Sequence, residues 1–106
     1  MYAKVYNLKF VKPSDAKIAS SYFAEHLAKF IRMCNMQSIN ICLGPCGSLS
    51  VSTKFENSSD LKNFEAKSKP VFDDIKSSFD YIQTNYSGVY VLTYEAESAS
   101  TEITVN

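Results

Sequence analysis

The chain has no tryptophan, a single histidine and no net charge, because its 11 basic residues balance its 11 acidic ones over a length of 106 residues. A neutral surface lacks the basic patch that phosphate backbones attract, so nucleic-acid binding is disfavoured. No uninterrupted apolar run of about 18 residues occurs, and no charged n-region precedes an apolar core, which argues against a membrane span and a secretory signal. We therefore expect a cytoplasmic protein.

Cysteine is also scarce, and the three cysteines, Cys34, Cys42 and Cys46, cannot all pair within one chain. Reduced thiols are the simpler interpretation, in keeping with a cytoplasmic setting. Cys42 and Cys46 lie on opposite arms of an expected hairpin, and no second cysteine pair or neighbouring histidine completes a tetrahedral site. The sequence therefore predicts no metal site, and it carries no signature of a cofactor.

What the chain does contain is an alternation of strand-like and helix-like segments, in the order strand, helix, strand, strand, helix, strand. The helical segments have apolar residues at three- and four-residue spacing, and the strand segments have alternating apolar residues. The predicted helices cover residues 14–35 and 59–83, and the predicted strands cover residues 2–11, 38–43 and 49–55 and a last segment that begins at Gly88.

Four local features set the expected boundaries. Ser14 follows a proline and is a suitable N-cap for the first helix. The tetrapeptide Gly-Pro-Cys-Gly at 44–47 has the composition of a type I turn between two strands. Pro70 interrupts the second helical segment, so a kink or a division into two helices is expected there. Gly88 then restarts an extended segment.

This order of elements, with short connections and right-handed crossovers, predicts an α+β sandwich: an antiparallel sheet in the order 4-1-3-2 with both helices on one face. The last strand is apolar on both sides over residues 89–94, so the open face is expected to carry an apolar patch. Covering such a patch would stabilise an assembly by on the order of 10 kcal/mol before association costs. We therefore expect one domain over residues 1–97 that forms a homodimer through its sheet, followed by a polar tail, 98–106, which could add a strand.

The element order, a strand that ends in Phe55-Glu56 and the stretch Asp-Leu-Lys-Asn-Phe-Glu-Ala at 60–66 resemble the dimeric α/β-barrel superfamily. That group has a ferredoxin-like fold and includes antibiotic-biosynthesis-type monooxygenases and many small proteins of unknown activity. The resemblance implies two protomers packed sheet to sheet, with a pocket between sheet and helices in each. Haem-degrading members use an Asn on the first strand with a His and a Trp. Asn7 matches that Asn, but without a Trp, and with the only His in the first helix, haem chemistry is not expected.

His26 is the main candidate for chemistry, because it lies one helical turn from Tyr22 at the margin of the buried stripe. Partial desolvation there would lower the imidazole pKa and leave a neutral group able to exchange a proton. A half-exposed structural histidine is the alternative. Tyr90 and Tyr94, together with Asn7, could offer hydroxyl and amide groups to a small apolar ligand, or could pack on the sheet instead.

Two classes of function remain open. In the first, the protein is a small homodimeric enzyme of the cofactor-independent, monooxygenase-like kind, or a small-molecule binder. Its pocket for a small aromatic or apolar ligand lies between the first helix and the sheet, with His26, Tyr22 and Asn7 as polar lining. In the second, a non-catalytic interaction or regulatory module uses the sheet face and the 98–106 tail. An RNA-recognition module shares the element order, but the strand at 48–55 lacks the stacking aromatics. A cavity of about 300 Å³ that reaches His26 would favour the first class, and a filled core there the second.

Overall fold

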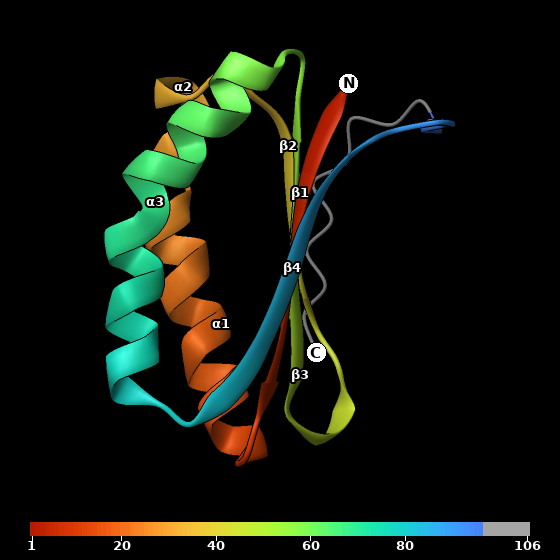
Figure 1. Ribbon diagram of the computed structural model, residues 1–106. Coiled ribbons are helices and arrows are strands. Elements are labelled where there is room, and N and C mark those ends of the chain that lie inside the picture. Colours follow the sequence, from red (N-terminus) through yellow and green to blue (C-terminus); the bar gives the residue numbers. More distant parts are fainter. Residues whose placement is uncertain (97–106) are drawn as a thin grey trace.

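The computed structural model describes residues 1–96, and these form two layers, with a sheet on one side and helices on the other (Figure 1). The sheet is antiparallel throughout, in the order β2-β3-β1-β4, which is the predicted order read from its other edge. Its strands are β1 (Tyr2–Phe10), β2 (Met36–Leu43), β3 (Ser48–Phe55) and β4 (Tyr81–Val89). The predicted ferredoxin-like fold is therefore confirmed.

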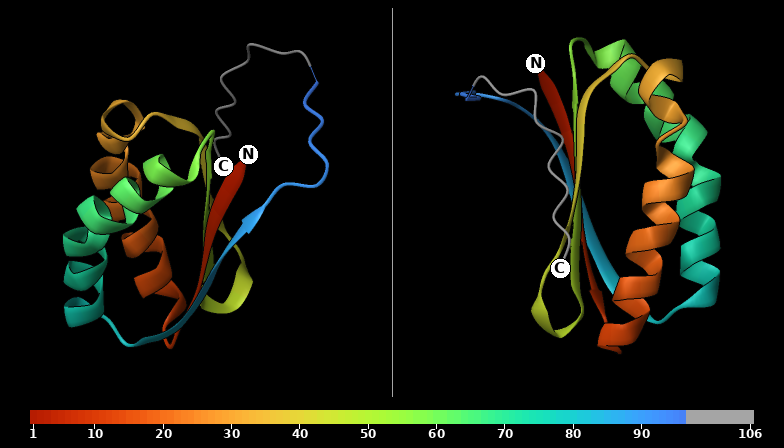
Figure 2. Two further views of the ribbon diagram at one scale, coloured as in Figure 1. Left: turned by 45° about the horizontal axis from the view of Figure 1, so that its top comes forward. Right: turned by 180° about the vertical axis from the view of Figure 1, so that it is seen from behind.

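The helices α1 (Pro13–Leu27) and α3 (Ser58–Ser78) lie over the same face of the sheet, and the short α2 (Phe30–Met33) follows α1 (Figure 2). The predicted first helix is thus two helices. Ser14 is not its cap, since α1 begins at Pro13 and no side chain caps the preceding Lys12. Proline suits this position because its fixed φ is already helical and its missing N–H is not needed there. Within residues 1–96, no helix combines the length and hydropathy needed to cross a bilayer.

The core lies between the helices and the sheet. Five large side chains are completely buried there, and they come from α1, α3 and β3: Phe23, Leu27, Val51, Phe55 and Phe64. The rings of Phe55 and Phe64 lie 5.5 Å apart between their centroids, so strand and helix pack directly on one another. Each such side chain contributes about 1.5–3 kcal/mol through its removal from water. The space between α1 and the sheet is therefore filled.

The connection between β2 and β3 is a hairpin, as predicted, but its turn is not of type I. Cys46 and Gly47 both have positive φ, 57° and 86°, whereas a type I turn needs a negative φ at Cys46. The N–H of Gly44 donates to the carbonyl oxygen of Ser48 at 2.8 Å and closes the loop. The glycine at 47 is what permits this shape, because its φ lies in the left-handed region.

The helix α3 runs through Pro70 as one element rather than dividing into two. Pro70 is exposed, so the carbonyl group that loses its intrahelical partner, that of Ala66, can be hydrated. The helix ends at Ser78 and not near residue 83, and residues 81–83 belong to β4 instead.

The last strand also begins earlier than predicted. β4 pairs with β1 from Tyr81 opposite Phe10 to Val89 opposite Tyr2. One further backbone hydrogen bond joins the N–H of Tyr90 to the Met1 carbonyl oxygen at 3.0 Å. Residues 90–96, which we call the arm, then run beyond the sheet (Figure 1). The apolar alternation at 89–94 was therefore wrongly read as the body of the last strand.

The sheet face turned away from the helices is more polar than predicted. In the strand register, β2 and β3 direct mainly serine, asparagine, cysteine and lysine side chains to this open face. Exposed apolar groups on this face gather on β4, at Ile82 and Tyr86. The expected apolar patch is therefore reduced to one margin of the face and the adjoining arm. The predicted tail, 98–106, lies outside the described residues.

Candidate functional site

The helix α3 and the uncovered strand β4 form a groove, which we call the α3–β4 groove. The helices pack on β1, β2 and β3, so the helix side of β4 is left open. Three adjoining hollows, of about 360, 180 and 300 Å³, follow this groove. The first two share Phe72 and Gln83 in their walls, and the second and third share Glu65. A small molecule therefore has a continuous surface on which to lie.

The β4 wall of the groove is polar because no helix covers it. Gln83, Asn85 and Ser87 alternate on the helix side of β4, where they lie opposite Leu8, Tyr6 and Lys4 of β1. The amide groups of Gln83 and Asn85 line the central hollow. Each amide offers both donors and an acceptor, which suits binding of polar groups on a ligand.

Two hydroxyl groups lie at the centre of the groove. Tyr6 is buried, and its ring stacks on Phe72 of α3 with 4.3 Å between centroids. Ser68 of α3 is only 1% exposed, and its Oγ has no hydrogen-bond partner within residues 1–96. Tyr6 and Ser68 both line the central hollow. A buried hydroxyl without a partner costs about 1–3 kcal/mol, so it marks a position where a ligand can supply the missing bond.

An ion pair lies beside these hydroxyls. The Nζ of Lys4 is 2.8 Å from Oε2 of Glu65, and it stands 5.7 Å from the centroid of the Tyr6 ring. Burial raises the pKa of Tyr6 far above its ordinary value, and the Glu65 carboxylate raises it further. The nearby Ser68 hydroxyl lowers the pKa of Tyr6 by less than these two effects raise it. Tyr6 is therefore a neutral hydrogen-bond donor at physiological pH and not a base.

The groove can thus orient a small molecule that has an aromatic part and an acceptor oxygen. Phe72 supplies an aromatic wall, and the hydroxyls of Tyr6 and Ser68 supply donors. Neutral donors fixed in a partly dry site can stabilise negative charge that develops on a substrate oxygen. Among the described residues, no group of three His, Cys, Asp or Glu is placed to hold a metal ion.

Tyr22 and His26, predicted from the sequence, lie together on α1 but outside this groove. The Tyr22 hydroxyl donates to Oδ2 of Asp74 at 2.8 Å, and the two rings lie 4.1 Å apart between centroids. Neither residue lines any of the three hollows of the α3–β4 groove. Because Phe23 and Leu27 fill the space beneath α1, the helix–sheet cavity lies under α3 instead of the first helix.

The other three predicted residues lie on the opposite side of the sheet. Asn7 lines a shallow hollow of about 410 Å³ on the open face. Tyr90 and Tyr94 belong to the arm and line a separate hollow of about 240 Å³ beside Lys54. Within one copy, the predicted residues therefore lie in three separate places: on α1, on the open sheet face and on the arm.

Sequence reasoning missed the residues of the α3–β4 groove. Tyr6 and Phe72 fit the apolar spacing of a strand and of a helix, so neither indicated a binding site. Lys4 and Glu65 are far apart in the sequence, so their ion pair could not be predicted. One signal was present, because Ser68 interrupts the apolar stripe of the second helical segment with a polar side chain. A serine at a core position is a sign of an internal polar site.

We expect the free energy of unfolding to fall as the pH rises above about 10, the ordinary pKa of tyrosine. Unfolded tyrosines ionise there, whereas the raised pKa of Tyr6 keeps it protonated in the folded state, so folding becomes less favourable with increasing pH. Urea unfolding between pH 8 and 11 should show a smaller loss for Tyr6→Phe than for the unmodified protein. The remaining loss comes from other groups with raised pKa values, which include Tyr81. Equal pH dependence of the two proteins would contradict this role of Tyr6.

Comparisons with known proteins identify the fold. No family model matches the chain, and no curated protein matches its sequence. A dimeric ferredoxin-like protein from an uncultured marine organism superimposes with a TM-score of 0.70 at 10% identity, over 91% of this chain and all of the other. An antibiotic biosynthesis monooxygenase gives a TM-score of 0.65 at 16% identity, over 85% of this chain and 99% of the other.

A third similar structure shows how far such likenesses reach. A de novo designed protein with a ferredoxin fold gives a TM-score of 0.59 at 12% identity, over 91% of this chain and 92% of the other. A shared architecture therefore does not carry an activity with it. The structure neighbours of this chain are ferredoxin-like dimeric proteins and antibiotic-biosynthesis-monooxygenase-like proteins, and the likeness establishes its fold.

Proposed function

We propose that this protein binds a small aromatic or apolar molecule in the α3–β4 groove and acts on it as a cofactor-independent, monooxygenase-like enzyme. The observation that carries the proposal is the buried, unpartnered hydroxyl of Ser68 beside the neutral phenol of Tyr6. A folded chain tolerates such a cost where a ligand completes the hydrogen bond. An antibiotic biosynthesis monooxygenase shares the fold, and its activity is the reason why this class of reaction is chosen for the proposal.

Each wall of the groove has a part in this proposal. The ring of Phe72, already stacked on Tyr6, offers its partly exposed area to an aromatic substrate. Tyr6 and Ser68 donate to a carbonyl or phenolic oxygen of that substrate and stabilise the negative charge of its anion, from which electrons pass to dioxygen, the oxidant of such a reaction. Lys4 is held in an ion pair by Glu65, whose carboxylate helps to keep Tyr6 protonated. The protein thus supplies orientation and hydrogen bonds.

Self-association is part of the same proposal. One of the similar structures is described as dimeric, and Ile82 and Tyr86 leave an exposed apolar margin on the open sheet face. A second copy that covers this margin would remove it from water, which favours a homodimer. The proposed setting is the cytoplasm, where the exposed thiols of Cys42 and Cys46 stay reduced.

A panel of aromatic and quinone-like compounds, read by the shift in melting temperature, tests the groove. A compound that binds the folded state alone should raise the melting temperature of the unmodified protein. Tyr6→Phe should reduce that shift, because it removes a donor and keeps the packed ring. The matched control Tyr86→Phe, on the exposed open face, should leave the shift unchanged. Equal shifts for Tyr6→Phe and the unmodified protein would refute the assignment.

The sequence-based candidate is tested in the same panel. His26→Ala should leave the shifts unchanged if the groove is the site, because His26 lines none of its three hollows. Ligand-dependent shifts in melting temperature that are lost in His26→Ala would assign the binding site to α1 instead of the groove.

A second candidate function uses the open sheet face for binding, as a non-catalytic interaction or regulatory module. It is favoured by the hollow of about 410 Å³, whose walls include Asn7, Ser50 and Thr84. These amide and hydroxyl groups offer a partner hydrogen-bonding positions beside the apolar side chain of Ile82. Ligand shifts that survive Tyr6→Phe and disappear in Asn7→Ala would favour this candidate over the groove.

A further inference from the structure

The largest hollow of the α3–β4 groove collects three hydrogen-bond donors. Its volume is about 360 Å³, and its walls include Lys76 of α3 together with Tyr81 and Gln83 of β4. We call it the Lys76 hollow. An ammonium group, a phenol and a primary amide can all donate to one acceptor group on a ligand. Phe72 and Gln83 also line the central hollow, so a single ligand can occupy both.

The charges around these two hollows leave one lysine without a partner. Three lysines and two carboxylates line them: Lys4, Lys69, Lys76, Glu65 and Asp73. Lys4 pairs with Glu65 at 2.8 Å, and Lys69 pairs with Asp73 at 3.0 Å. Lys76 forms no ion pair within residues 1–96. The two hollows therefore carry one net positive charge, located at Lys76, and they favour an anionic ligand.

Tyr81 adds a neutral donor to this hollow. Burial raises the pKa of Tyr81, and the Asp73 carboxylate raises it further, so the hydroxyl stays protonated at physiological pH. The Tyr81 ring stacks on Phe10 of β1 with 4.8 Å between centroids, which fixes its position on the sheet. Hydrogen bonds to a charged group stabilise a complex more than bonds between neutral groups. A carboxylate in this hollow would therefore gain from both the phenol and the ammonium group.

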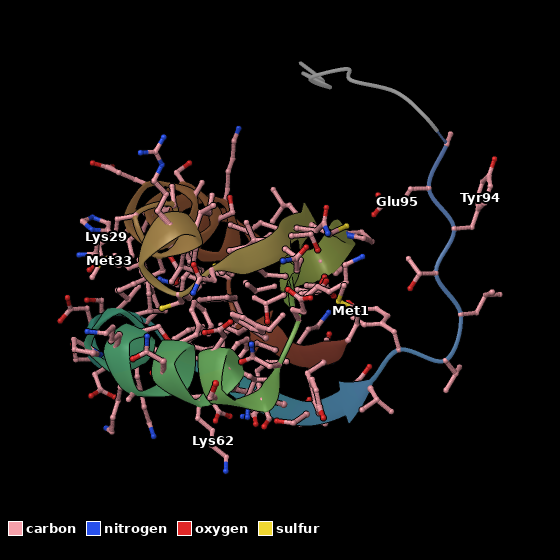
Figure 3. The ribbon with its side chains drawn as sticks, turned by 90° about the horizontal axis from the view of Figure 1, so that it is seen from above. Met1, Lys29, Met33, Lys62, Tyr94 and Glu95 are labelled. Atoms are coloured by element: carbon pink, nitrogen blue, oxygen red, sulfur yellow. The ribbon has the colours of Figure 1, made fainter. Side chains whose placement is uncertain are left out.

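The opposite end of the groove does not offer an equivalent site. Lys62 lies at the third hollow, but it is exposed, and Figure 3 shows its side chain extending outward from α3. The buried Leu61, Val89 and the ring of Tyr2 make much of the wall of this hollow apolar. That end suits an apolar part of a ligand, and the Lys76 hollow suits an anionic part.

We propose that the ligand of the groove is an aromatic carboxylic acid whose carboxylate binds in the Lys76 hollow. This rests on the proposed function and deepens it, because it names the class of molecule and the direction in which it lies. The carboxylate accepts from Lys76, Tyr81 and Gln83. The aromatic ring lies against Phe72, and an oxygen at its other end reaches the hydroxyl groups of the central hollow. Contacts at both ends fix the orientation of the ring, which a reaction at one ring carbon requires.

A matched pair of compounds tests the anionic group alone. The compounds are 6-hydroxy-2-naphthoate and its methyl ester, which share the ring and the phenolic hydroxyl and differ in charge at neutral pH. Isothermal titration calorimetry on the full chain should show that the acid binds about tenfold more tightly than the ester. The ratio should fall at high ionic strength, because salt screens the charge of a lysine at the surface. Equal affinities at low salt would overturn the inference.

Two variants of α3 assign the difference to Lys76. Lys76→Met keeps the apolar stem and removes the charge at an exposed position, so the fold should be retained. It should weaken binding of the acid about tenfold and leave binding of the ester unchanged. The control Lys67→Met removes an exposed lysine that lines none of the three hollows of the groove, and it should change neither affinity. A preference for the acid that survives Lys76→Met would refute the assignment.

Two tyrosine variants separate this inference from the function on which it rests. Tyr6→Phe removes a donor from the central hollow, so it should weaken binding of acid and ester alike. Tyr81→Phe keeps the ring on Phe10 and should weaken binding of the acid alone. Binding of both compounds that responds to Tyr6→Phe but not to Tyr81→Phe or Lys76→Met would overturn this inference and leave the proposed function standing. Failure of both compounds to bind would overturn the two together.

Discussion

Gly47→Ala is expected to lower the free energy of unfolding by about 2–4 kcal/mol, a large share of the stability of a domain of this size. Gly47 has a φ of +86°, which costs an L-residue about 1–2 kcal/mol. A Cβ there would also stand 2.5 Å from the carbonyl oxygen of Phe10, and backbone atoms cannot move away cheaply. The end of β1 and the β2–β3 hairpin would therefore have to separate.

Gly44→Ala is the matched control, since it lies in the same loop. Its φ is −102°, and a Cβ would meet the Ser48 Cβ at 3.3 Å, a contact that a small shift can relieve. We expect a loss below about 1 kcal/mol for this variant. Urea unfolding of both variants gives the comparison. Equal losses would show that the close approach of Gly47 to Phe10 does not constrain the fold.

The order of the elements could be predicted because each segment carries its own periodicity. The boundary between the last helix and the last strand could not be predicted in this way. Ile75, Phe79 and Ile82 continue the helical spacing, so the apolar stripe extends past Ser78, where α3 ends. What turns residues 81–89 into a strand is pairing with β1, a long-range contact that local spacing does not report.

The same shift of boundary explains why the residues of the α3–β4 groove were not predicted from the sequence. With the last strand set at residue 88 and beyond, the apolar alternation of the arm was assigned to the sheet, residues 81–83 of β4 to a helix, and residues 84–87 to no element. Gln83 and Asn85 therefore could not be recognised as the wall of a groove. His26 drew attention as the single histidine, but a residue type identifies chemistry only when a cavity lies beside it.

Ser68→Ala is expected to change stability and binding in opposite directions. Removing a buried hydroxyl that has no partner should raise the free energy of unfolding by about 1 kcal/mol. The same change should weaken binding of a groove ligand by about tenfold, because the ligand loses a donor worth roughly 1.4 kcal/mol. Chemical denaturation and ligand-dependent melting shifts on one preparation measure both effects.

The control Ser77→Ala removes an exposed hydroxyl from the same helix, where it donates to the carbonyl oxygen of Asp74 at 3.0 Å. Any gain from the higher helix propensity of alanine is shared by both variants, so their difference reports the buried position. A loss of stability in Ser68→Ala would mean that its hydroxyl is satisfied without a ligand. Since a core residue kept for packing alone should improve when its polar group is removed, a gain in stability joined to a loss of binding would assign Ser68 to function.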